Sequence, residues 1–392
     1  MSSTVRAGSY RDVFLLPSAL RTFAPALAGR LAYGLLPLSA LFTVQQRTGS
    51  FAIAGAATAG FGLASLSMPY KSRLVDRYSQ RRVLPGLALV CAAGLILLTA
   101  IPTTNAAALV ALTTGSGVFA PPLGPSMRAS WRRLTEGTEL KERAYALDAI
   151  CEESLYLLGP LLAGFLISLW SAPVALTATA ALLAVGTFLM VTSPVTRHTE
   201  EPARSRHPLG PLTLPALRRI LLVILVTASG ISVAYLCLAG VAAGQGHPGA
   251  TGFLEAGIGL GSVVGGLLWA RRQHTRSSWT HLAGLIGVLA AGLLAASTTT
   301  NLVLLGVVMA AAGVAVAPLF VVSYLAADEL TPPDQRTEAS TWINTANNLG
   351  SSAGASLAGL AIDRSGPALG FVAGGVLLAL TSLTLALGRR RA

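Results

Sequence analysis

The 392-residue chain is 53% hydrophobic, only 11% of its residues are charged, and its mean hydropathy is +0.65. A soluble protein of this size carries roughly 25% charged residues, so these charges are too few to coat a globule and lipid must solvate much of the surface. The formal net charge of +12 would indicate nucleic-acid binding in a soluble protein, whereas in a membrane protein it is typical of basic cytoplasmic loops.

Hydropathy predicts twelve membrane-spanning helices, because a spanning helix needs about 20 mainly apolar residues. Residues 1–21 contain only short apolar runs, so we expect no cleavable signal peptide. The first span is then expected to serve as the insertion signal. The predicted spans are residues 22–44, 49–69, 83–102, 105–127, 144–169, 172–192, 219–243, 250–270, 279–298, 300–326, 338–361 and 367–388.

The Lys and Arg residues give these spans an orientation. If segment 1–21 is cytoplasmic, alternate loops place nearly all of the 28 basic residues on the cytoplasmic side, counting Arg219 at the edge of a loop. The exceptions are Arg30 within a span and Arg47 and Arg364 in opposite loops. This asymmetry predicts a multi-pass protein of the cell membrane with cytoplasmic ends at 1–21 and 389–392.

The loop after the second span places one aspartate among basic residues, in the segment Ser72-Arg-Leu-Val-Asp76-Arg77-Tyr-Ser79-Gln-Arg81-Arg82. This segment resembles the signature loop of the major facilitator superfamily, Gly-x-x-x-Asp-Arg/Lys-x-Gly-x-Arg/Lys-Arg/Lys, with serines in place of both glycines. The resemblance implies a cytoplasmic gating loop that latches two halves of the protein together in one state. An ordinary basic loop would explain the arginines but not the aspartate.

The fifth span contains a Gly-Pro pair in the segment Leu158-Gly159-Pro160-Leu-Leu-Ala163-Gly164. It partly resembles the motif of antiporters in the same superfamily, although Leu155 and Ala163 stand where the family has glycine. Gly-Pro within a span bends the helix and lets a neighbouring helix approach closely. Helix packing alone is therefore the alternative to an antiporter role.

Five charged side chains lie inside the predicted spans, beyond their first residues: Arg30, Asp148, Glu152, Glu153 and Glu255. An ionisable group near the bilayer centre costs at least about 2.5 kcal/mol, so it is usually paired or functional. Arg30 and Glu152 both lie about 12 Å into their spans from the cytoplasmic end. Because the family's topology makes helices one and five neighbours, the resemblance predicts a buried Arg30–Glu152 ion pair.

The carboxylates are candidates for proton coupling. Asp148 and Glu152 share a helix face, whereas Glu153 is rotated by about 100°, and clustered carboxylates cannot all ionise cheaply. We expect Glu152 or Glu153 to carry the proton, with a purely structural ion pair as the alternative. Asp148 is expected to make structural contacts near the helix end. Glu255, near the outer side, is a second titrating or substrate-contacting candidate, unless it is a partly wetted carboxylate beside a loop.

Residues 193–218 form a polar, proline-containing linker between two sets of six spans, residues 22–192 and 219–388. The two sets resemble each other at Ala144–Gly164 and Ser340–Gly359, where polar residues recur every three to four positions before a run of small residues. We therefore predict an all-α integral membrane fold with twelve transmembrane helices in two pseudo-symmetric six-helix bundles.

Aromatic and amide side chains in the spans are candidates for lining a substrate cavity. Amides in a span bond to neighbouring helices or line a wet cavity, and a lone aromatic is usually a packing residue. The candidates, which include one of the charged residues above, are Arg30, Tyr33, Tyr235, Phe320, Trp342, Asn344 and Asn348.

The sequence argues against an ATP-driven pump and against an enzyme. It has no phosphate-binding Gly-x-x-x-x-Gly-Lys-Ser/Thr segment, and no converging nucleophile, base or metal set, so we expect neither a metal nor a cofactor. The resemblance implies alternating access around a central site.

We expect proton-coupled export of a small amphipathic drug or metabolite by a monomer. The expected partners are that small molecule, protons and the lipid bilayer, without nucleic acid. One alternative is uptake of a small nutrient by proton symport or uniport, and another is a non-transporting membrane sensor.

Overall fold

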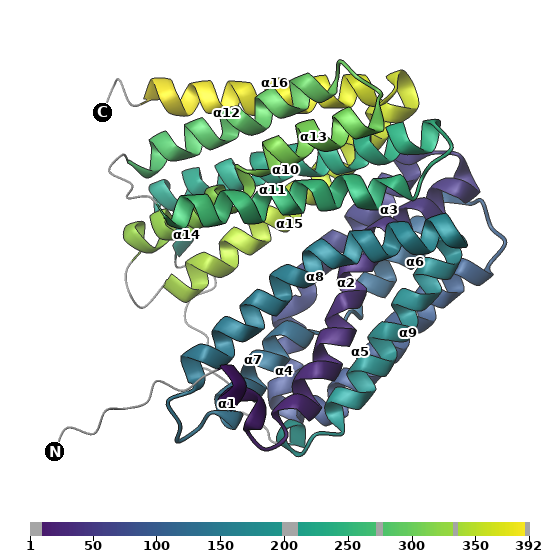
Figure 1. The fold of residues 1–392 in the computed structure, drawn as a ribbon. Coiled ribbons are helices and arrows are strands. Elements are labelled where there is room, and N and C mark those ends of the chain that lie inside the picture. The colour runs from purple at the N-terminus through teal and green to yellow at the C-terminus, as the bar shows by residue number, and fades with distance from the viewer. Residues whose placement is uncertain (1–9, 198–210, 272–276, 332–335, 389–392) are drawn as a thin grey trace.

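The computed structural model describes residues 10–197, 211–271, 277–331 and 336–388. A few side chains inside helices, those of Asp76 and Glu153 among them, lie outside the description. The described residues form α-helices joined by short turns (Figure 1). The predicted all-helical membrane fold is confirmed, since ten described helices are long and apolar enough to cross a membrane.

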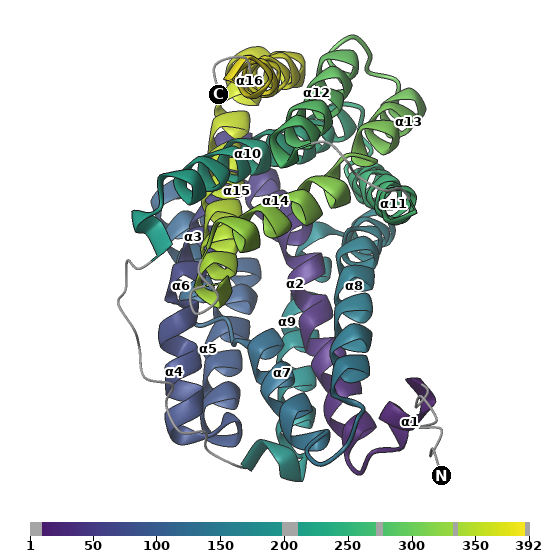
Figure 2. The ribbon, with the colours of Figure 1, turned by 90° about the vertical axis from the view of Figure 1, so that its left-hand side faces the viewer.

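The first bundle is formed by the described helices α1 to α9 (Figures 1 and 2). A 3-10 turn, η1 (Ser65–Ser67), joins α3 to α4, and Pro121 and Pro122 separate α6 from α7 because proline lacks the N–H that would continue the helix. Each of these pairs forms one broken crossing. The helices are α1 (Tyr10–Leu15), α2 (Ala19–Thr48), α3 (Phe51–Ala64), α4 (Met68–Tyr78), α5 (Gln80–Ala100), α6 (Ala106–Val118), α7 (Leu123–Leu134), α8 (Lys141–Leu169) and α9 (Ala172–Val191).

The second bundle follows a connecting segment in which η2 (Pro194–Arg197) and η3 (Pro211–Thr213) are described. The rest of the predicted linker, residues 198–210, lies outside the described ranges. In this bundle α13 and α14 form one broken crossing. The helices are α10 (Pro215–Gly244), α11 (Ala250–Ala270), α12 (Ser278–Ala296), α13 (Leu302–Gly313), α14 (Val316–Leu330), α15 (Arg336–Ser365) and α16 (Pro367–Gly388).

Two crossings are not among the ten strongly apolar helices. One is formed by α3 together with α4, and the other is α15. Both lie where the two bundles meet, so protein covers part of their surface in place of lipid. A Cβ atom added to Gly55 of α3 would lie 2.5 Å from the carbonyl oxygen of Ala355 in α15, which shows how closely the two backbones approach. The low hydropathy of α15 fits its place at the junction, whereas α3 is apolar but only 14 residues long.

The bundles are joined at one end by two helix pairs, α3 with α15 and α8 with α11. In the second pair, a Cβ atom added to Gly164 would lie 2.5 Å from the carbonyl oxygen of Gly249. From this closed end the bundles diverge toward the opposite end, where α1 begins and α16 ends (Figure 1). We call that opposite end the termini end.

Asp363, in the last turn of α15, connects the bundles at the closed end. Its carboxylate accepts hydrogen bonds from the backbone N–H groups of Phe51 (2.8 Å) and Ala52 (3.0 Å) and from the hydroxyl of Ser50. The first N–H groups of a helix have no partner within the helix and favour a negative charge. The α15 carboxylate thus caps α3 across the junction.

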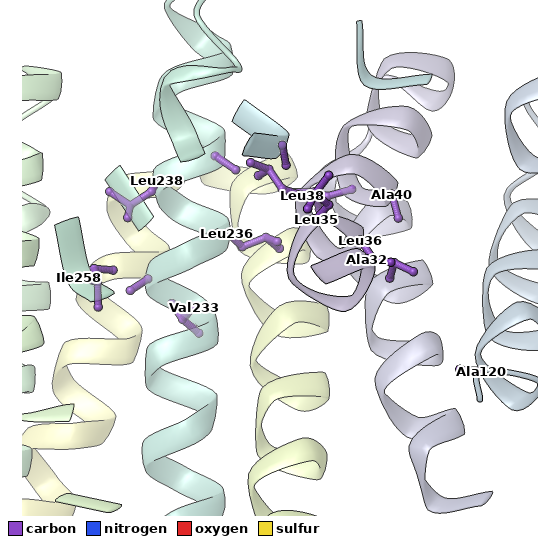
Figure 3. Close-up of a cluster of buried hydrophobic side chains, with 14 of the residues drawn as sticks. Ala32, Leu35, Leu36, Leu38, Ala40, Ala120, Val233, Leu236, Leu238 and Ile258 are labelled. Atoms are coloured by element: carbon purple, nitrogen blue, oxygen red, sulfur yellow. The ribbon is translucent and has the colours of Figure 1, made fainter. Parts of the chain in front are cut away.

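Apolar side chains fill the middle of the junction. Leu35 and Leu38 of α2 and Leu236 of α10 belong to one cluster of buried hydrophobic side chains (Figure 3). All three side chains are buried.

Candidate functional site

A cavity of about 390 Å³ lies between the two bundles. Its walls come from α2, α3 and α8 on one side and from α10, α11, α14 and α15 on the other. Three predicted cavity aromatics, Tyr33, Tyr235 and Phe320, line it, as does Glu255. Most other lining residues are apolar or carry small hydroxyl or amide groups. We call this space the central cavity.

Glu255 of α11 is the single charged side chain among the described lining residues of the central cavity. Within the described part of the chain, no Lys, Arg or His forms an ion pair with it. An ionised carboxylate without a counter-charge is costly to hold in an apolar environment. Glu255 therefore needs a proton or a positively charged ligand.

A second cavity, of about 340 Å³, lies mainly within the first bundle. Arg30, Lys71, Arg128 and Glu152 line it, and we call it the charged cavity. Tyr33 lines both cavities, and its hydroxyl donates a 2.6 Å hydrogen bond to the carbonyl oxygen of Pro121. The two cavities thus share a wall at Tyr33.

Arg30 is the centre of a buried ion cluster beside the charged cavity. Its Nη1 lies 2.7 Å from Asp148 Oδ1, and its Nη2 lies 2.8 Å from Glu152 Oε2. Glu152 also accepts a longer, 3.4 Å contact from Nη1 of Arg128. The structure therefore brings Arg30 and Glu152 together, as the depth argument anticipated.

Asp148 differs from the sequence-based expectation of contacts near the helix end. It is 2% exposed and forms the buried hydrogen bond to Arg30. The reason is that α8 begins at Lys141, earlier than predicted, so Asp148 lies about two turns inside the helix. Because Asp148 and Glu152 share one face, the forked guanidinium of Arg30 contacts both carboxylates.

Lys71 was not predicted as a site residue, because it was interpreted as part of a basic loop. It is 3% exposed, and its ammonium group donates to the carbonyl oxygens of Ala120 (2.8 Å) and Gly117 (3.4 Å). These carbonyls lie at the C-terminal end of α6, where a cation is favourable. Nothing in the sequence separates Lys71 from neighbouring topogenic bases, so only packing identifies it.

The polar face of α15 divides between the cavities and helix packing. Asn348 lines the charged cavity and donates a 2.9 Å hydrogen bond to the Ser65 hydroxyl of the first bundle. Asn344 instead accepts a 2.9 Å bond from the Tyr324 hydroxyl of α14. Among the described lining residues of the two cavities, neither Asn344 nor Trp342 occurs.

The predicted gating loop spans the end of α4 and the start of α5. Arg77 is exposed and lies 5.2 Å above the Tyr78 ring, and Arg81 and Arg82 are also exposed. The side chain of Asp76 lies outside the described part of the structure. The latch role of this loop therefore stays a prediction.

The Gly-Pro motif of α8 contacts one helix in each bundle and also lines the central cavity. Gly159 packs directly on Gly34 of α2, within the first bundle, whereas Gly164 packs on α11 in the second bundle. Pro160 between them lines the central cavity. The motif thus links the packing of the first bundle to the junction.

A comparison with protein-family models decides the family. Residues 22–355 match the model of the Major Facilitator Superfamily. The chain belongs to the major facilitator superfamily. It is accordingly a membrane transporter of small molecules and not an enzyme, and a search of curated proteins finds no match to it.

Solved structures share the major facilitator fold with this chain at low sequence identity. A point mutant of the nucleoside transporter NupG has 16% identity and a TM-score of 0.74, with coverage of 93% of this chain and 99% of that chain. The human organic anion transporter MFSD10 (TETRAN) has 18% identity and a TM-score of 0.60, covering 96% and 100%. A point mutant of the peptide transporter POT has 15% identity and a TM-score of 0.69, covering 98% and 99%. At these identities the likeness extends to the fold alone.

Proposed function

We propose that this superfamily member works by alternating access and exports a small amphipathic compound across the cell membrane in exchange for protons. The observation that carries the proposal is Glu255, a carboxylate in the wall of the central cavity that has no ion-pair partner among the described residues. A site between two rocking bundles is where transporters of this architecture bind their cargo.

The basic loops support an assignment of the termini end to the cytoplasm. The bundles are joined at the opposite end by the α15 cap on α3 and by the α8–α11 contact. On this assignment the structure corresponds to a state that is open to the cytoplasm and takes up its cargo there.

Glu255 is a better proton carrier than the carboxylates of α8. Asp148 is paired with Arg30, and Glu152 is paired with Arg30 and Arg128. Glu255 has no such ion-pair partner among the described residues. The α8 carboxylates then hold α2 against α8, and Glu153 remains a further candidate.

The test is proton-coupled flux in proteoliposomes with an imposed pH gradient, measured with a panel of neutral, anionic and cationic amphipathic compounds. We expect at least one compound to move against its own gradient when protons flow the other way. Glu255→Gln should abolish this gradient-driven flux. The matched control is Glu329→Gln, at an exposed carboxylate of α14.

Three results would contradict the proposal. If no flux of any compound responds to the pH gradient, proton coupling is wrong. If gradient-driven flux survives Glu255→Gln but not Glu152→Gln, the proton carrier is assigned to the wrong helix. If the compound and the protons move in the same direction, the protein is a symporter.

A further inference from the structure

The central cavity has an asymmetric charge pattern. Its described lining residues include one acid and no Lys, Arg or His. The other titratable side chains among its described lining residues are the phenols of Tyr33 in α2 and Tyr235 in α10. No fixed positive charge among the described residues therefore lines the cavity to attract an anionic cargo.

The nearest arginine cluster is already satisfied by protein carboxylates. Arg30 lies between Asp148 and Glu152, and its side chain is 4% exposed. Breaking a buried ion pair leaves an uncompensated charge and is strongly unfavourable. Arg30 is thus not free to bind an anion from the central cavity.

Aromatic rings surround the same carboxylate-bearing space. Tyr33, Tyr235 and Phe320 line it from α2, α10 and α14. The hydroxyl of Tyr33 is held by the carbonyl oxygen of Pro121, which fixes its ring in the wall. Aromatic faces attract cations, and the attraction is largest where water is excluded.

We infer that the cargo is a lipophilic organic cation, such as a quaternary ammonium or phosphonium compound, whose charge is held by Glu255 and whose apolar groups contact the three aromatic rings. This rests on the proposed function and adds the substrate class to it. The cavity volume of about 390 Å³ falls within the roughly 300–1,000 Å³ of pockets that bind drug-sized ligands.

A single carboxylate then serves both the proton and the cargo. One unit of negative charge in an apolar cavity is neutralised by one proton or by one monovalent cation. Binding of either excludes the other, and an empty, ionised Glu255 is the costly state. The exchange of a cation for a proton follows without a second titrating site.

The experiment measures binding to the purified full-length protein in detergent, so that it does not depend on transport. Three probes are compared: tetraphenylphosphonium, the smaller cation benzyltrimethylammonium, and tetraphenylborate, which has nearly the shape of the first probe and the opposite charge. We expect at least one cation to bind, more weakly as the pH falls, and tetraphenylborate to bind at least tenfold more weakly than tetraphenylphosphonium.

Variants then locate the site. Glu255→Gln should lower cation affinity at least tenfold and remove its pH dependence, while Glu255→Asp keeps the pH dependence. Phe320→Ala should lower affinity about 2- to 30-fold, the range of a cation–π contact of about 0.5–2 kcal/mol. Glu329→Gln should leave affinity unchanged, and a monodisperse elution profile shows that each variant is folded.

The outcomes separate this inference from the proposed function. Binding of neither cation, equal binding of tetraphenylborate, or undiminished binding to Glu255→Gln would overturn the inference. Proton-coupled flux confined to neutral or anionic compounds would also overturn it but leave proton-coupled transport intact. Glu255-dependent cation binding without any flux that responds to the pH gradient would support the cation site and refute the proposed function.

Discussion

Replacement of Asp363 by Ala removes the carboxylate through which α15 caps α3 across the junction. The carboxylate accepts from two backbone N–H groups and one hydroxyl of the other bundle. When the closed end opens, water solvates these groups, so the capping energy contributes only while the end is closed. We expect the substitution to shift the conformational equilibrium toward opening of that end.

The size of the shift follows from the exposure of the site. Asp363 is exposed, so the loss is that of a helix cap, about 0.5–2 kcal/mol. With tenfold for each 1.4 kcal/mol, the ratio of closed to open molecules should fall about 2- to 30-fold. Asp363→Asn keeps the shape and one acceptor oxygen, so its effect should be smaller.

The assay is double electron–electron resonance between spin labels at Thr104 and His247, exposed positions on the α5–α6 and α10–α11 connections. The three native cysteines are replaced first. Asp363→Ala should increase the fraction of long distances, and Arg364→Ala, at the adjacent exposed position, should not. An unchanged distance distribution, or an equal shift in both variants, would refute the capping argument.

Five further substitutions make three predictions, which are tested by thermal unfolding in detergent except where label distances are named. Arg30→Met should lower the free energy of unfolding by about 3–5 kcal/mol, because it leaves a buried carboxylate unpaired; a loss below about 1 kcal/mol would contradict the buried ion pair. Gly159→Ala should lower the free energy of unfolding by about 1–3 kcal/mol, because its Cβ atom meets the backbone of α2. Gly164→Ala should instead mainly open the closed end, measured as a change in the distances between the spin labels. Equal effects of the two substitutions on stability and on label distances would argue against this difference. Ser79→Gly should stabilise the protein by about 1 kcal/mol or more, because Ser79 has φ 76° and ψ 151°, a backbone conformation that favours glycine. Ser72→Gly, inside α4, should destabilise the protein by about 0.5–1 kcal/mol. Stabilisation by both substitutions would show that backbone strain at Ser79 is not the cause.

The Ser79 conformation shows how far a family motif is transferable. The superfamily signature has glycine at the positions of both Ser72 and Ser79. Only Ser79 lies at a backbone angle that favours glycine, between α4 and α5, whereas Ser72 lies within α4. The loop therefore keeps the backbone path of the motif at one of its two glycine positions, at a cost in strain.

Much of the fold was predictable from the sequence, because hydropathy and charge act locally along a membrane protein. A span must be apolar over about 20 residues, and the distribution of 28 Lys and Arg predicts an orientation without knowledge of packing. The gating-loop residues and the Gly-Pro pair predicted the family that the comparison identified. The ionisable residues within the spans were also visible in the sequence, because charge in lipid is rare.

The roles of those ionisable residues were decided only by tertiary structure, because a partner is set by which helices pack and at what height. Depth along two helices suggested the Arg30–Glu152 contact, but it did not indicate that Arg30 also pairs with Asp148, at 2.7 Å. Lys71 is buried because α6 ends beside it. Glu255 lines a cavity that helices of both bundles enclose, and the described lining residues supply no counter-charge. Each of these environments is built from segments distant in sequence, and no local pattern records which of them will meet.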